Sequence, residues 1–541
     1  MVLPKVLLKV TSHWLLTCHK AARKVRSYGF LHRNPSRLHQ ISSLCSSVTK
    51  CPLEGREDLS LVCDFQGTLM RSASPFPFFM LVAFEAGGLL RALLLMLSFP
   101  LLLALGQNGE ASLRIMVFVT FFGLRTKDAK LVARAVLPKF YSESLHLHAY
   151  EVLASTKKKE VITSMPRIMV EVFLKEYLSV DRVVASELQV FMRGRYFTGL
   201  MSESSLLGVK QKALKDFYGE VKADVCLVSP SNPHDHLFVS YSKEAYVVNK
   251  EETISGKCSS TSTILPRDKY PKPIIFHDGR LAFFPTPSAS LALFLYLPLG
   301  FALTVIRITL GVIIPYRVSL LIGALTGVRF RVGGCKPKKK ASTSKGVLYV
   351  CTHRTLLDPV MLSAALERSV PAVTYSLSRI SEMIAPVKTV RLTRDRERDA
   401  KTMKRLLEEG DLAVCPEGTT CREPYLLRFS PLFTELADEI EPVALDAEVK
   451  MFYGTTASGH KWLDPVMFMM NPMPGYKVEF LGRVPREMTR AAGWSSAEVA
   501  NMIQRQLADA LGFECTGLTR RGKYMMLAGN EGVVGAIKGE N

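Results

Sequence analysis

Acidic residues are missing from the beginning of this chain. Neither aspartate nor glutamate occurs before Glu54, while lysine, arginine, serine and histidine recur there. The same stretch lacks the long apolar core of a secretory signal. Two interpretations of residues 1–55 stay open: a mitochondrial or plastid targeting segment, or a basic, partly amphipathic tail that lies on an anionic lipid surface.

Cysteine pairs at metal-binding or redox spacing are also missing. The sequence has 11 cysteines, but none forms a Cys-x-x-Cys pair and none stands at zinc-site spacing from a histidine. These absences argue against a zinc-dependent or disulfide-stapled protein. Scattered, reduced thiols are typical of a protein that faces the cytosol.

An unambiguous spanning helix, which needs roughly 20 apolar residues, is missing as well. Three shorter or interrupted apolar blocks occupy residues 75–106, 115–124 and about 288–328, the last containing Arg307 and Pro315. Helical hairpins or helices embedded in one leaflet therefore fit as well as full spans. Because the first two blocks lie between strand-like segments of one expected domain, they must enter and leave the membrane on the same side.

What the chain does have is length and positive charge. Its 541 residues exceed one ordinary core, so about two to three domains are expected. Lysine and arginine exceed aspartate and glutamate by 21, which favours an anionic partner, and the mean hydropathy of +0.14 favours a membrane. A polybasic segment, 329–345, is expected to contact anionic headgroups. Nucleic-acid binding ranks last, because the basic residues do not alternate with exposed aromatics.

The first half has the pattern of a parallel α/β sheet. Short apolar segments near 59–63, 160–163 and 223–229 alternate with helical patterns such as MPRIMVEVFLKEYL and KQKALKDFYG. The stretch LVCDFQGTLM leads from such a segment to Asp64 and a Gly-Thr turn. That layout places a carboxylate at the end of a strand, where a nucleophile is presented to substrate.

On these segments the first half resembles the haloacid dehalogenase superfamily of phosphatases, which implies a Rossmann-like domain. The resemblance assigns Asp64 to the nucleophile, Thr163 to the hydroxyl motif and Lys210 to the lysine that steadies phosphate. Gln66, however, stands where the acid/base aspartate is expected. The segment Ser229–His234 replaces the one that would hold magnesium.

These replacements matter chemically. Attack of a carboxylate on a phosphate brings anions together, so Mg²⁺ must screen them through hard oxygen ligands, and Pro230 offers none. A general acid or base contributes about 10²–10⁴-fold, whereas the amide of Gln66 does not titrate. We therefore expect a retained phosphatase fold without phosphatase activity.

The second half places a histidine close to an aspartate. GVLYVCTHRTLLDPVML (346–362) begins as a strand, passes through a turn with His353 and restarts as a helix at Asp358. Aspartate before proline predicts Asp358 as the helix N-cap. By itself the motif is equally compatible with a simple cap beside an ordinary loop histidine.

Three further stretches follow in order: VRLTRDR (390–396), LAVCPEGTT (412–420) and IEPVAL (440–445). Together the four blocks resemble those of glycerophosphate and lysophosphatidate acyltransferases. The closest resemblance is to the land-plant glycerol-3-phosphate acyltransferases, which join a phosphatase-like domain to this acyltransferase. It covers nearly the whole chain after the N-terminal tail.

The resemblance implies roles for individual residues. His353 would accept the proton of the attacking hydroxyl, and Asp358 would orient the ring and stabilise the imidazolium. Arg394 would bind the substrate phosphate, helped by two further arginines of the same block. The two helping arginines are Arg391 and Arg396. The remaining residues implied at the substrate are Glu417, Gly418, Thr419, Arg422 and Arg428.

We therefore expect a membrane-associated enzyme that moves a fatty acyl group from acyl-CoA to glycerol 3-phosphate and releases lysophosphatidic acid. The resemblance implies the sn-2 hydroxyl, no metal or cofactor beyond acyl-CoA as co-substrate, and phospholipid or cutin- and suberin-type lipid synthesis. The endoplasmic reticulum is the expected membrane, with mitochondria left open. Two alternatives remain: a bifunctional enzyme that also removes the phosphate to give monoacylglycerol, and a non-catalytic membrane scaffold.

The expected parts are a tail, a phosphatase-like domain with a membrane insertion at about 75–124, a linker, apolar helices, the acyltransferase domain and a C-terminal tail without readable chemistry. Their expected boundaries are 1–55, 56–250, 251–285, 286–328, 329–515 and 516–541.

Overall fold

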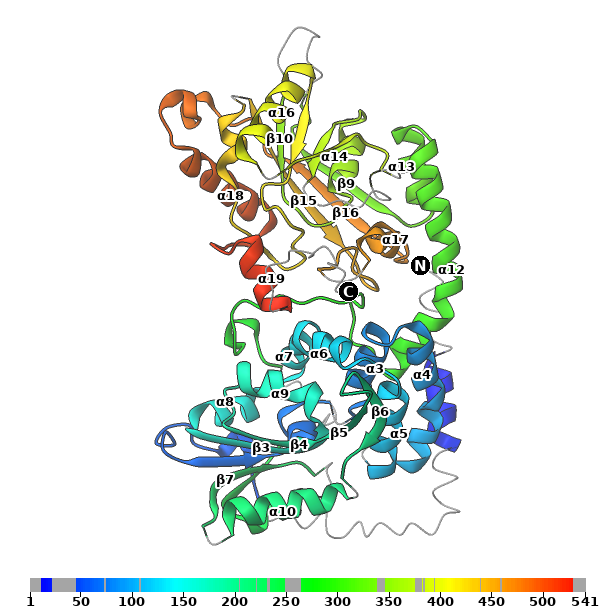
Figure 1. The fold of residues 1–541 in the computed structure, drawn as a ribbon, viewed down its shortest axis with the longest axis vertical. Helices are drawn as coiled ribbons and strands as arrows, with labels where there is room; N and C mark the ends of the chain where they lie inside the picture. Colours follow the sequence, from blue (N-terminus) through cyan, green and yellow to red (C-terminus); the bar gives the residue numbers. More distant parts are fainter. Residues whose placement is uncertain are drawn as a thin grey trace, which may run out of the picture. The chain divides into compact units, whose positions relative to one another are not determined.

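The chain divides into two compact α/β units in the computed structural model (Figure 1). The N-terminal unit contains residues 1–279 and 284–295, and the C-terminal unit contains 280–283 and 296–541. Parts of the expected tail, linker and polybasic segment lie outside the described residues. The structure describes residues 11–21, 45–72, 74–106, 109–203, 205–219, 221–230, 234–248, 264–337, 346–374, 382, 385–393, 395–437, 439–457 and 460–528.

A parallel sheet in the order β1-β8-β7-β2-β3-β4 forms the core of the N-terminal unit. Its central strands β2 (Ser60–Cys63), β3 (Lys158–Pro166) and β7 (Ala223–Val228) confirm the three predicted segments and their parallel arrangement. The flanking strands are β1 (Ser46–Ser47), β4 (Arg182–Ser186) and β8 (Ser242–Val247), and a separate hairpin joins β5 (Leu188–Phe191) to β6 (Tyr196–Met201). Because β1 pairs with β8, the sheet begins before residue 56.

Helices α9 (Arg167–Glu176) and α10 (Leu206–Tyr218) are the two helices that the sequence pattern predicts. They lie on opposite faces of the sheet (Figure 1). The apolar side chains of α10, such as Leu214, pack against Val62 and Cys226 of the central strands. This packing holds the carboxyl ends of β2 and β7 side by side, where Asp64 follows β2.

A helical insertion follows β2. Its apolar helices pack against one another: α3 is buried along most of its length, and α4 buries one face. Arg91, which interrupts the first apolar block, donates to the carbonyls of Thr120 and Phe122 at 2.8 Å each and so caps the end of α5. The insertion comprises α3 (Phe76–Glu85), α4 (Leu89–Leu105), α5 (Glu110–Phe121), α6 (Thr126–Ala135), α7 (Leu137–Ser144) and α8 (Leu147–Ser155).

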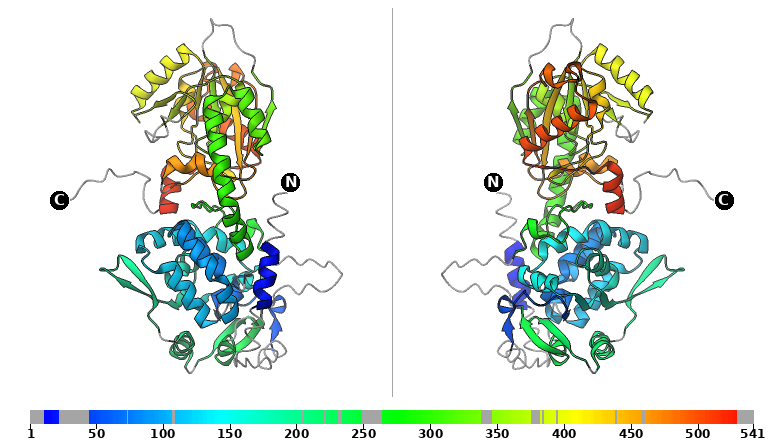
Figure 2. Two further views of the ribbon diagram at one scale, coloured as in Figure 1. Left: turned by 90° about the vertical axis from the view of Figure 1, so that its right-hand side faces the viewer. Right: turned by 90° about the vertical axis from the view of Figure 1, so that its left-hand side faces the viewer.

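One helix within the described residues is long and apolar enough to cross a membrane by length and composition, namely α12 (Pro287–Ile313). Figure 2 shows it as one continuous helix. Its single charged residue, Arg307, is buried and donates to the carbonyls of Met469 (2.5 Å) and Asn471 (2.7 Å) in the C-terminal unit. These bonds satisfy the guanidinium and fasten the second part of α12 to that unit. After Pro315 the third apolar block continues as α13 (Tyr316–Leu325).

The C-terminal unit contains a seven-stranded sheet in the order β12-β11-β13-β10-β15-β16-β9. Strands β15 and β16 are antiparallel, and every other neighbouring pair is parallel. The four sequence blocks contribute strands β10, β12, β13 and β15; β13, β10 and β15 are neighbours, and β11 separates β12 from β13. The strands are β9 (Arg329–Gly334), β10 (Leu348–Cys351), β11 (Ala372–Thr374), β12 (Thr389–Arg391), β13 (Leu412–Val414), β15 (Ile440–Glu448) and β16 (Gly475–Phe480).

Helices cover both faces of this sheet (Figures 1 and 2). One apolar cluster joins Leu406 and Ile503, from two helices on one face, and a second joins Leu362 and Phe468 on the other. The amphipathic helix predicted after Asp395 is confirmed, with Asp395 as its cap. The helices are α14 (Asp358–Leu366), α16 (Arg396–Glu409), α17 (Asp464–Met469), α18 (Ser496–Leu511) and α19 (Arg520–Ala528).

The end of the described chain belongs to the fold, whereas the sequence suggested a featureless tail from residue 516. Strand β17 (Glu514–Cys515) pairs with β14 (Tyr425–Leu426). The side-chain amide of Gln504 donates to the carbonyls of Leu427, directly after β14, and Thr516, directly after β17. In α19, Lys523 and Tyr524 are buried. The composition of this segment hid its role because its burial depends on partners about a hundred residues earlier in the sequence.

Asn471 is a buried junction that holds the loop after β15 to the end of α17. Its amide oxygen accepts from the backbone N–H groups of residues 450, 451 and 452. Its amide nitrogen donates to the carbonyls of Phe452, Met467 and Phe468. An asparagine can provide both sets at once because its side chain is both acceptor and donor.

We predict that Asn471→Ala lowers the free energy of unfolding by roughly 3 kcal/mol, because it leaves buried backbone groups without partners. The thermal midpoint of the C-terminal unit should fall by roughly 5–10 °C in differential scanning calorimetry. The control is Asn501→Ala on the exposed side of α18, which should leave the midpoint within about 1 °C. Equal midpoints for the two variants would refute the role of Asn471.

Candidate active site

The candidate site lies at the carboxyl ends of two neighbouring parallel strands, β10 and β13. All four residues of β10 are buried, and the chain then leaves the sheet in a turn that contains His353. The turn after β13 contains Glu417 and Gly418. In open α/β sheets this edge is where ligands bind, so two sequence blocks meet where chemistry is expected.

His353 and Asp358 are in direct contact. His353 Nδ1 lies 2.8 Å from Asp358 Oδ2, and the aspartate is fully buried. Asp358 is the first residue of α14, with Leu357 as the cap residue, so the prediction of Asp358 as N-cap was wrong. Its carboxylate turns back toward the loop instead and accepts the backbone N–H groups of Arg354 (2.8 Å) and Thr355 (3.1 Å).

A further donor to Asp358 comes from a distant strand of the same sheet. The hydroxyl of Tyr476, on β16, donates to Asp358 Oδ1. Burial raises the pKa of Tyr476 well above its usual range, so the hydroxyl keeps its proton and remains a donor. With both oxygens occupied, the carboxylate is fixed and the imidazole has one orientation in which it can donate to Asp358.

Glu417 positions His353 through the backbone. Its Oε1 accepts the backbone N–H of His353 at 2.8 Å, and its Oε2 accepts the backbone N–H of Leu427 at 3.1 Å. Burial raises the pKa of Glu417, while these two donors oppose the rise. Gly418 has a φ of +68°, which lets the chain turn directly after the glutamate. Both carboxylate oxygens of Glu417 therefore hold the loop, and the expected contact between Glu417 and substrate stays a prediction.

Arg354 is a residue of this site that the sequence analysis missed. Its guanidinium pairs with Asp446 at 3.2 Å and donates to the carbonyls of Arg422 (2.9 Å) and Glu423 (2.7 Å). The side chain is only 5% exposed. It joins the histidine turn to the segment after Glu417. A signal was available in its place directly after His353, but the acid that pairs with it lies far along the chain.

The predicted substrate arginines have different surroundings. Arg391 pairs with Glu382 at 2.8 Å, and Arg396 pairs with Glu435 at 2.6 Å. Arg422 donates to the carbonyl of Thr455 and lies over the ring of Tyr453. Arg394, the residue implied to bind phosphate, lies outside the described residues.

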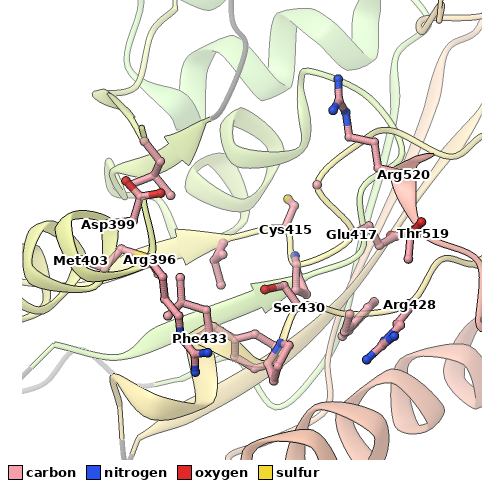
Figure 3. A pocket seen from close by; sticks show the side chains of 17 residues that line it. Arg396, Asp399, Met403, Cys415, Glu417, Arg428, Ser430, Phe433, Thr519 and Arg520 are labelled. Carbon is pink, nitrogen blue, oxygen red and sulfur yellow. The ribbon is translucent and has the colours of Figure 1, made fainter. Parts of the chain in front are cut away.

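A cavity of about 520 Å³ lies beside this loop (Figure 3). Of the predicted residues, Arg396, Glu417, Gly418 and Arg428 line it, whereas Arg391, Thr419 and Arg422 are not in its lining. Cys415 also lines the cavity, and its Sγ lies within 4.8 Å of the ligand atoms of His353 and Asp358. The cavity therefore extends to the neighbourhood of the histidine.

His353, Asp358 and Cys415 also have the geometry of a possible metal cluster. Burial raises the pKa of Cys415 well above its usual range, so its thiol stays protonated. A metal would need the thiolate and would compete with Asp358 for the histidine. A hydrogen-bonded histidine and aspartate account for these contacts without a metal.

The second site that the sequence predicts is at the end of β2 in the N-terminal unit. The ammonium of Lys210, on α10, donates to Asp64, and both side chains are buried. Thr163 is buried near the end of the neighbouring strand β3. The side-chain amide of Gln66 donates to the carbonyl of Ser72 at 2.5 Å. The structure thus brings the aspartate and lysine together and turns the glutamine amide to the backbone.

Asp235 is a carboxylate of this site that the sequence analysis missed. The predicted magnesium segment ended at His234, one residue before it. Asp235 is 1% exposed and accepts from the backbone N–H of Ser229 at 2.8 Å and from the hydroxyl of Thr68 at 3.4 Å. Burial and then the charge of Asp64 raise its pKa to about 8.

The donor set does not fit the magnesium ion that the phosphatase fold implies. Pro230 has no side-chain ligand, Gln66 offers a neutral amide oxygen in place of a carboxylate and bonds the backbone through its amide nitrogen, and the ammonium of Lys210 already neutralises Asp64. Mg²⁺ needs near-octahedral oxygen ligands, and Asp235 adds one carboxylate to Asp64. The pairing of Asp64 with Lys210 balances the charge without a metal.

Comparison with known proteins agrees with this division. Residues 60–248 match the family model described as "Glycerol-3-phosphate acyltransferase RAM2-like, HAD-like domain", and residues 334–446 match the acyltransferase model. Glycerol-3-phosphate acyltransferase 1 of Arabidopsis thaliana is 48% identical to this chain, over 99% of this chain and all of the relative. The chain belongs to the glycerol-3-phosphate acyltransferase family.

A second family member, glycerol-3-phosphate acyltransferase RAM2 of Petunia hybrida, is 47% identical over 86% of this chain and 97% of its own length. Among solved structures, the 1-acyl-sn-glycerophosphate acyltransferase of Thermotoga maritima matches 40% of this chain and 95% of its own, with 14% identity and a TM-score of 0.27. The family has a haloacid dehalogenase-like domain and an acyltransferase domain in one chain, as the sequence resemblance implied.

Tyr476→Phe is predicted to lower kcat/KM for acyl transfer by roughly 3- to 30-fold, because Asp358 loses one donor while its backbone contacts remain. Tyr349→Phe, a buried tyrosine whose hydroxyl bonds Arg368, is the matched control and should keep wild-type activity. The measurement is kcat/KM for acyl transfer by both variants in a steady-state assay. Thermal midpoints of the two variants are measured alongside to check that they are equally stable. Full activity of Tyr476→Phe would show that its hydroxyl does not hold Asp358.

The raised pKa of Asp235 predicts how the stability of the protein depends on pH. Its native pKa of about 8 exceeds the usual 3.8, so the stability that it contributes is complete below about pH 3.8 and is lost as the pH rises through about 8. An asparagine side chain at the same position has no proton to lose in this range. The thermal midpoint of Asp235→Asn relative to wild type should therefore rise between about pH 5 and about pH 8.5.

The control for this comparison is Asp216→Asn, an exposed aspartate on α10. Its midpoint relative to wild type should stay constant over the same range. A pH-independent difference for Asp235→Asn would mean that Asp235 has an ordinary pKa in the native state.

Proposed function

We propose that the C-terminal unit transfers an acyl group from acyl-CoA to a hydroxyl of glycerol 3-phosphate and releases lysophosphatidic acid. The observation that carries the proposal is the 2.8 Å contact between His353 Nδ1 and Asp358 at the edge of the sheet. The names of the relatives supply the acceptor. The neighbouring cavity supports a site for a small polar substrate.

The chemistry follows from the fixed histidine. With Nδ1 donating to Asp358, the other ring nitrogen, Nε2, has a free lone pair that accepts the proton of the acceptor hydroxyl. The hydroxyl oxygen attacks the thioester carbonyl, the new ester bond forms and the carbon–sulfur bond breaks. The coenzyme A thiolate then takes the proton from the imidazolium, which Asp358 stabilises. No acyl-enzyme is needed.

The proposal includes retention of the phosphate. Asp64 is neutralised by Lys210, and the donors around it do not suit magnesium. The N-terminal unit therefore serves as a scaffold, and the product keeps its phosphate. We assign the reaction to the sn-2 hydroxyl on the family resemblance, and positional analysis of the labelled product tests that assignment.

Attachment to a membrane forms a further part of the proposal. Helices α12 and α13 expose large apolar side chains along the C-terminal unit, and the basic residues of β9 follow directly. Such a surface suits the interior and headgroups of a lipid leaflet, from which acyl-CoA is drawn. The endoplasmic reticulum is the compartment that we propose. The exposed apolar residues include Leu299, Phe301, Val305, Ile313, Leu321 and Leu325.

His353→Ala should lower acyl transfer by at least about 10³-fold, because it removes the imidazole that accepts the proton. Binding of glycerol 3-phosphate should be largely kept, as measured by equilibrium binding of the labelled substrate. His460→Ala, an exposed histidine of the same unit, is the matched control and should keep full activity.

The same assay separates the alternatives when glycerol 3-phosphate carries labels in both the glycerol and the phosphate. Retention of both labels in the lipid product supports the proposal. Release of labelled phosphate in the presence of Mg²⁺ would show a bifunctional enzyme. Absence of acyl transfer by the wild-type protein with every acyl-CoA in a panel would favour the scaffold.

A further inference from the structure

Helix α19 (red in Figure 1), the last helix of the described chain, contacts the loop that contains the Glu-Gly-Thr turn. Two consecutive residues of the helix make these contacts. The ammonium of Lys523 donates to the carbonyl of Thr420, and the hydroxyl of Tyr524 bonds that of the preceding residue, Thr419. Both helix residues are buried. A segment in which the sequence showed no chemistry is therefore joined to the loop beside the candidate base.

A single peptide group connects Lys523 to the backbone of His353. This group joins Thr420 to Cys421. Its carbonyl accepts from the Lys523 ammonium, and its N–H, which belongs to Cys421, donates to the carbonyl of His353 at 2.7 Å. A donor on the carbonyl of a peptide polarises the group and strengthens the hydrogen bond that its N–H makes. The buried ammonium thus supports one of the bonds that hold the histidine.

The loop from Glu417 to Cys421 holds both backbone groups of His353. Glu417 accepts the N–H of the histidine at 2.8 Å, and Cys421 donates to its carbonyl. The third point of attachment is the ring, through the contact with Asp358. Because two of the three points belong to one loop, a shift of that loop moves the histidine backbone relative to Asp358. The direction of the ring nitrogen Nε2 therefore depends on what fixes the loop.

The contacts of α19 fix the loop beyond the Glu-Gly-Thr turn. The Thr420 hydroxyl lies 2.5 Å from that of Thr455, and the Tyr524 hydroxyl accepts from Lys461 at 3.3 Å. Burial raises the pKa of Tyr524, but the charge of Lys461, the hydrogen bond with Thr419 and the charge of Lys523 together lower it below its usual value. The phenol oxygen is therefore well placed as an acceptor that binds Thr419 and Lys461 together.

From these contacts we infer that Lys523 is a positioning residue for acyl transfer, which holds His353 in its reactive orientation through the Thr420–Cys421 peptide group. The inference rests on the proposed acyl transfer and adds helix α19 to the parts of the chain that support it. Lys523 acts on the histidine and not on a substrate, so its loss should lower the rate of the chemical step and leave substrate binding unchanged. A misplacement of about 1 Å at a reacting group costs on the order of 10²-fold in rate.

The alternative role for an ammonium group here is a bond to a substrate phosphate. Lys523 is only 6% exposed, and it is not part of the lining of the cavity beside the histidine. Its ammonium is engaged by the carbonyl of Thr420. This geometry favours positioning over phosphate binding. The two roles also differ in their kinetics, because phosphate binding acts on a Michaelis constant and positioning acts on kcat.

The test is steady-state kinetics of the full-length wild-type protein, Lys523→Met and Lys523→Arg. Methionine fills the space of the lysine stem but has no donor for Thr420, so kcat should fall about 10- to 100-fold. The KM for glycerol 3-phosphate and the KM for acyl-CoA should each stay within about 3-fold of wild type. Arginine keeps a charged donor and should restore kcat to within about 5-fold of wild type. All assays are run well below the thermal midpoint of each variant.

Lys404→Met, the same substitution at an exposed lysine of α16, is the matched control and should keep all three constants. A kcat of Lys523→Met within about 2-fold of wild type would overturn the inference, as would an equally low kcat in Lys523→Arg. A rise in either KM at unchanged kcat would also overturn it, because Lys523 would then bind substrate.

If Lys523→Met does not fold, Lys523→Gln, which has a shorter and neutral donor, decides by the same criteria. Its kcat should fall about 10-fold with both KM values kept, and an unchanged kcat would overturn the inference. An inactive wild-type protein would instead refute the proposed function, so the two failures are distinguishable.

Discussion

The hydrogen bond between His353 and Asp358 is the interaction on which the rest of the C-terminal unit depends. An imidazole accepts a proton at a defined place only when its other nitrogen is held by an acceptor that does not move. Asp358 meets this requirement because backbone N–H groups of its own loop and the Tyr476 hydroxyl occupy its oxygens. Glu417 holds the backbone of the histidine from the other side. Strands β10, β13 and β16 all contribute to one rigid centre.

The two units show two outcomes for buried carboxylates. In the C-terminal unit, Asp358 and Glu417 are surrounded by donors that leave the histidine accessible for chemistry. In the N-terminal unit, Asp64 is neutralised by Lys210, and Asp235 is held with a raised pKa by burial and the charge of Asp64. A nucleophilic carboxylate needs a metal to bring it to a phosphate, and the charge of this site is taken up by an internal pair. The N-terminal unit therefore keeps the phosphatase fold without the oxygen ligands that a magnesium ion needs.

Much of the fold was predictable because it follows from local patterns. The strands around Asp64, the strand before His353 and the amphipathic helix α16 all have apolar spacing that identifies them. The contact of His353 with Asp358 was also predictable, since the two residues are five positions apart across a strand-to-helix turn.

The rest depended on long-range packing. Tyr476 lies 118 residues from Asp358 in the sequence, and Arg520 lines the cavity because β17 pairs with β14 and Lys523 of α19 bonds the carbonyl of Thr420. The pattern around Glu417 does not reveal that its oxygens face the backbone. Asp235 was missed because a one-residue difference in segment length hides a carboxylate from spacing arguments.

The central claim is that Asp358 holds His353 in the one tautomer that can accept a proton. The most direct measurement is the ¹⁵N chemical shift of both ring nitrogens of His353 in protein labelled at histidine, assigned by comparison with His353→Gln. The account predicts a neutral ring with the proton on Nδ1 and an unprotonated Nε2. A neutral ring with the proton on Nε2 would contradict it, because the nitrogen that faces the substrate could not then act as the base.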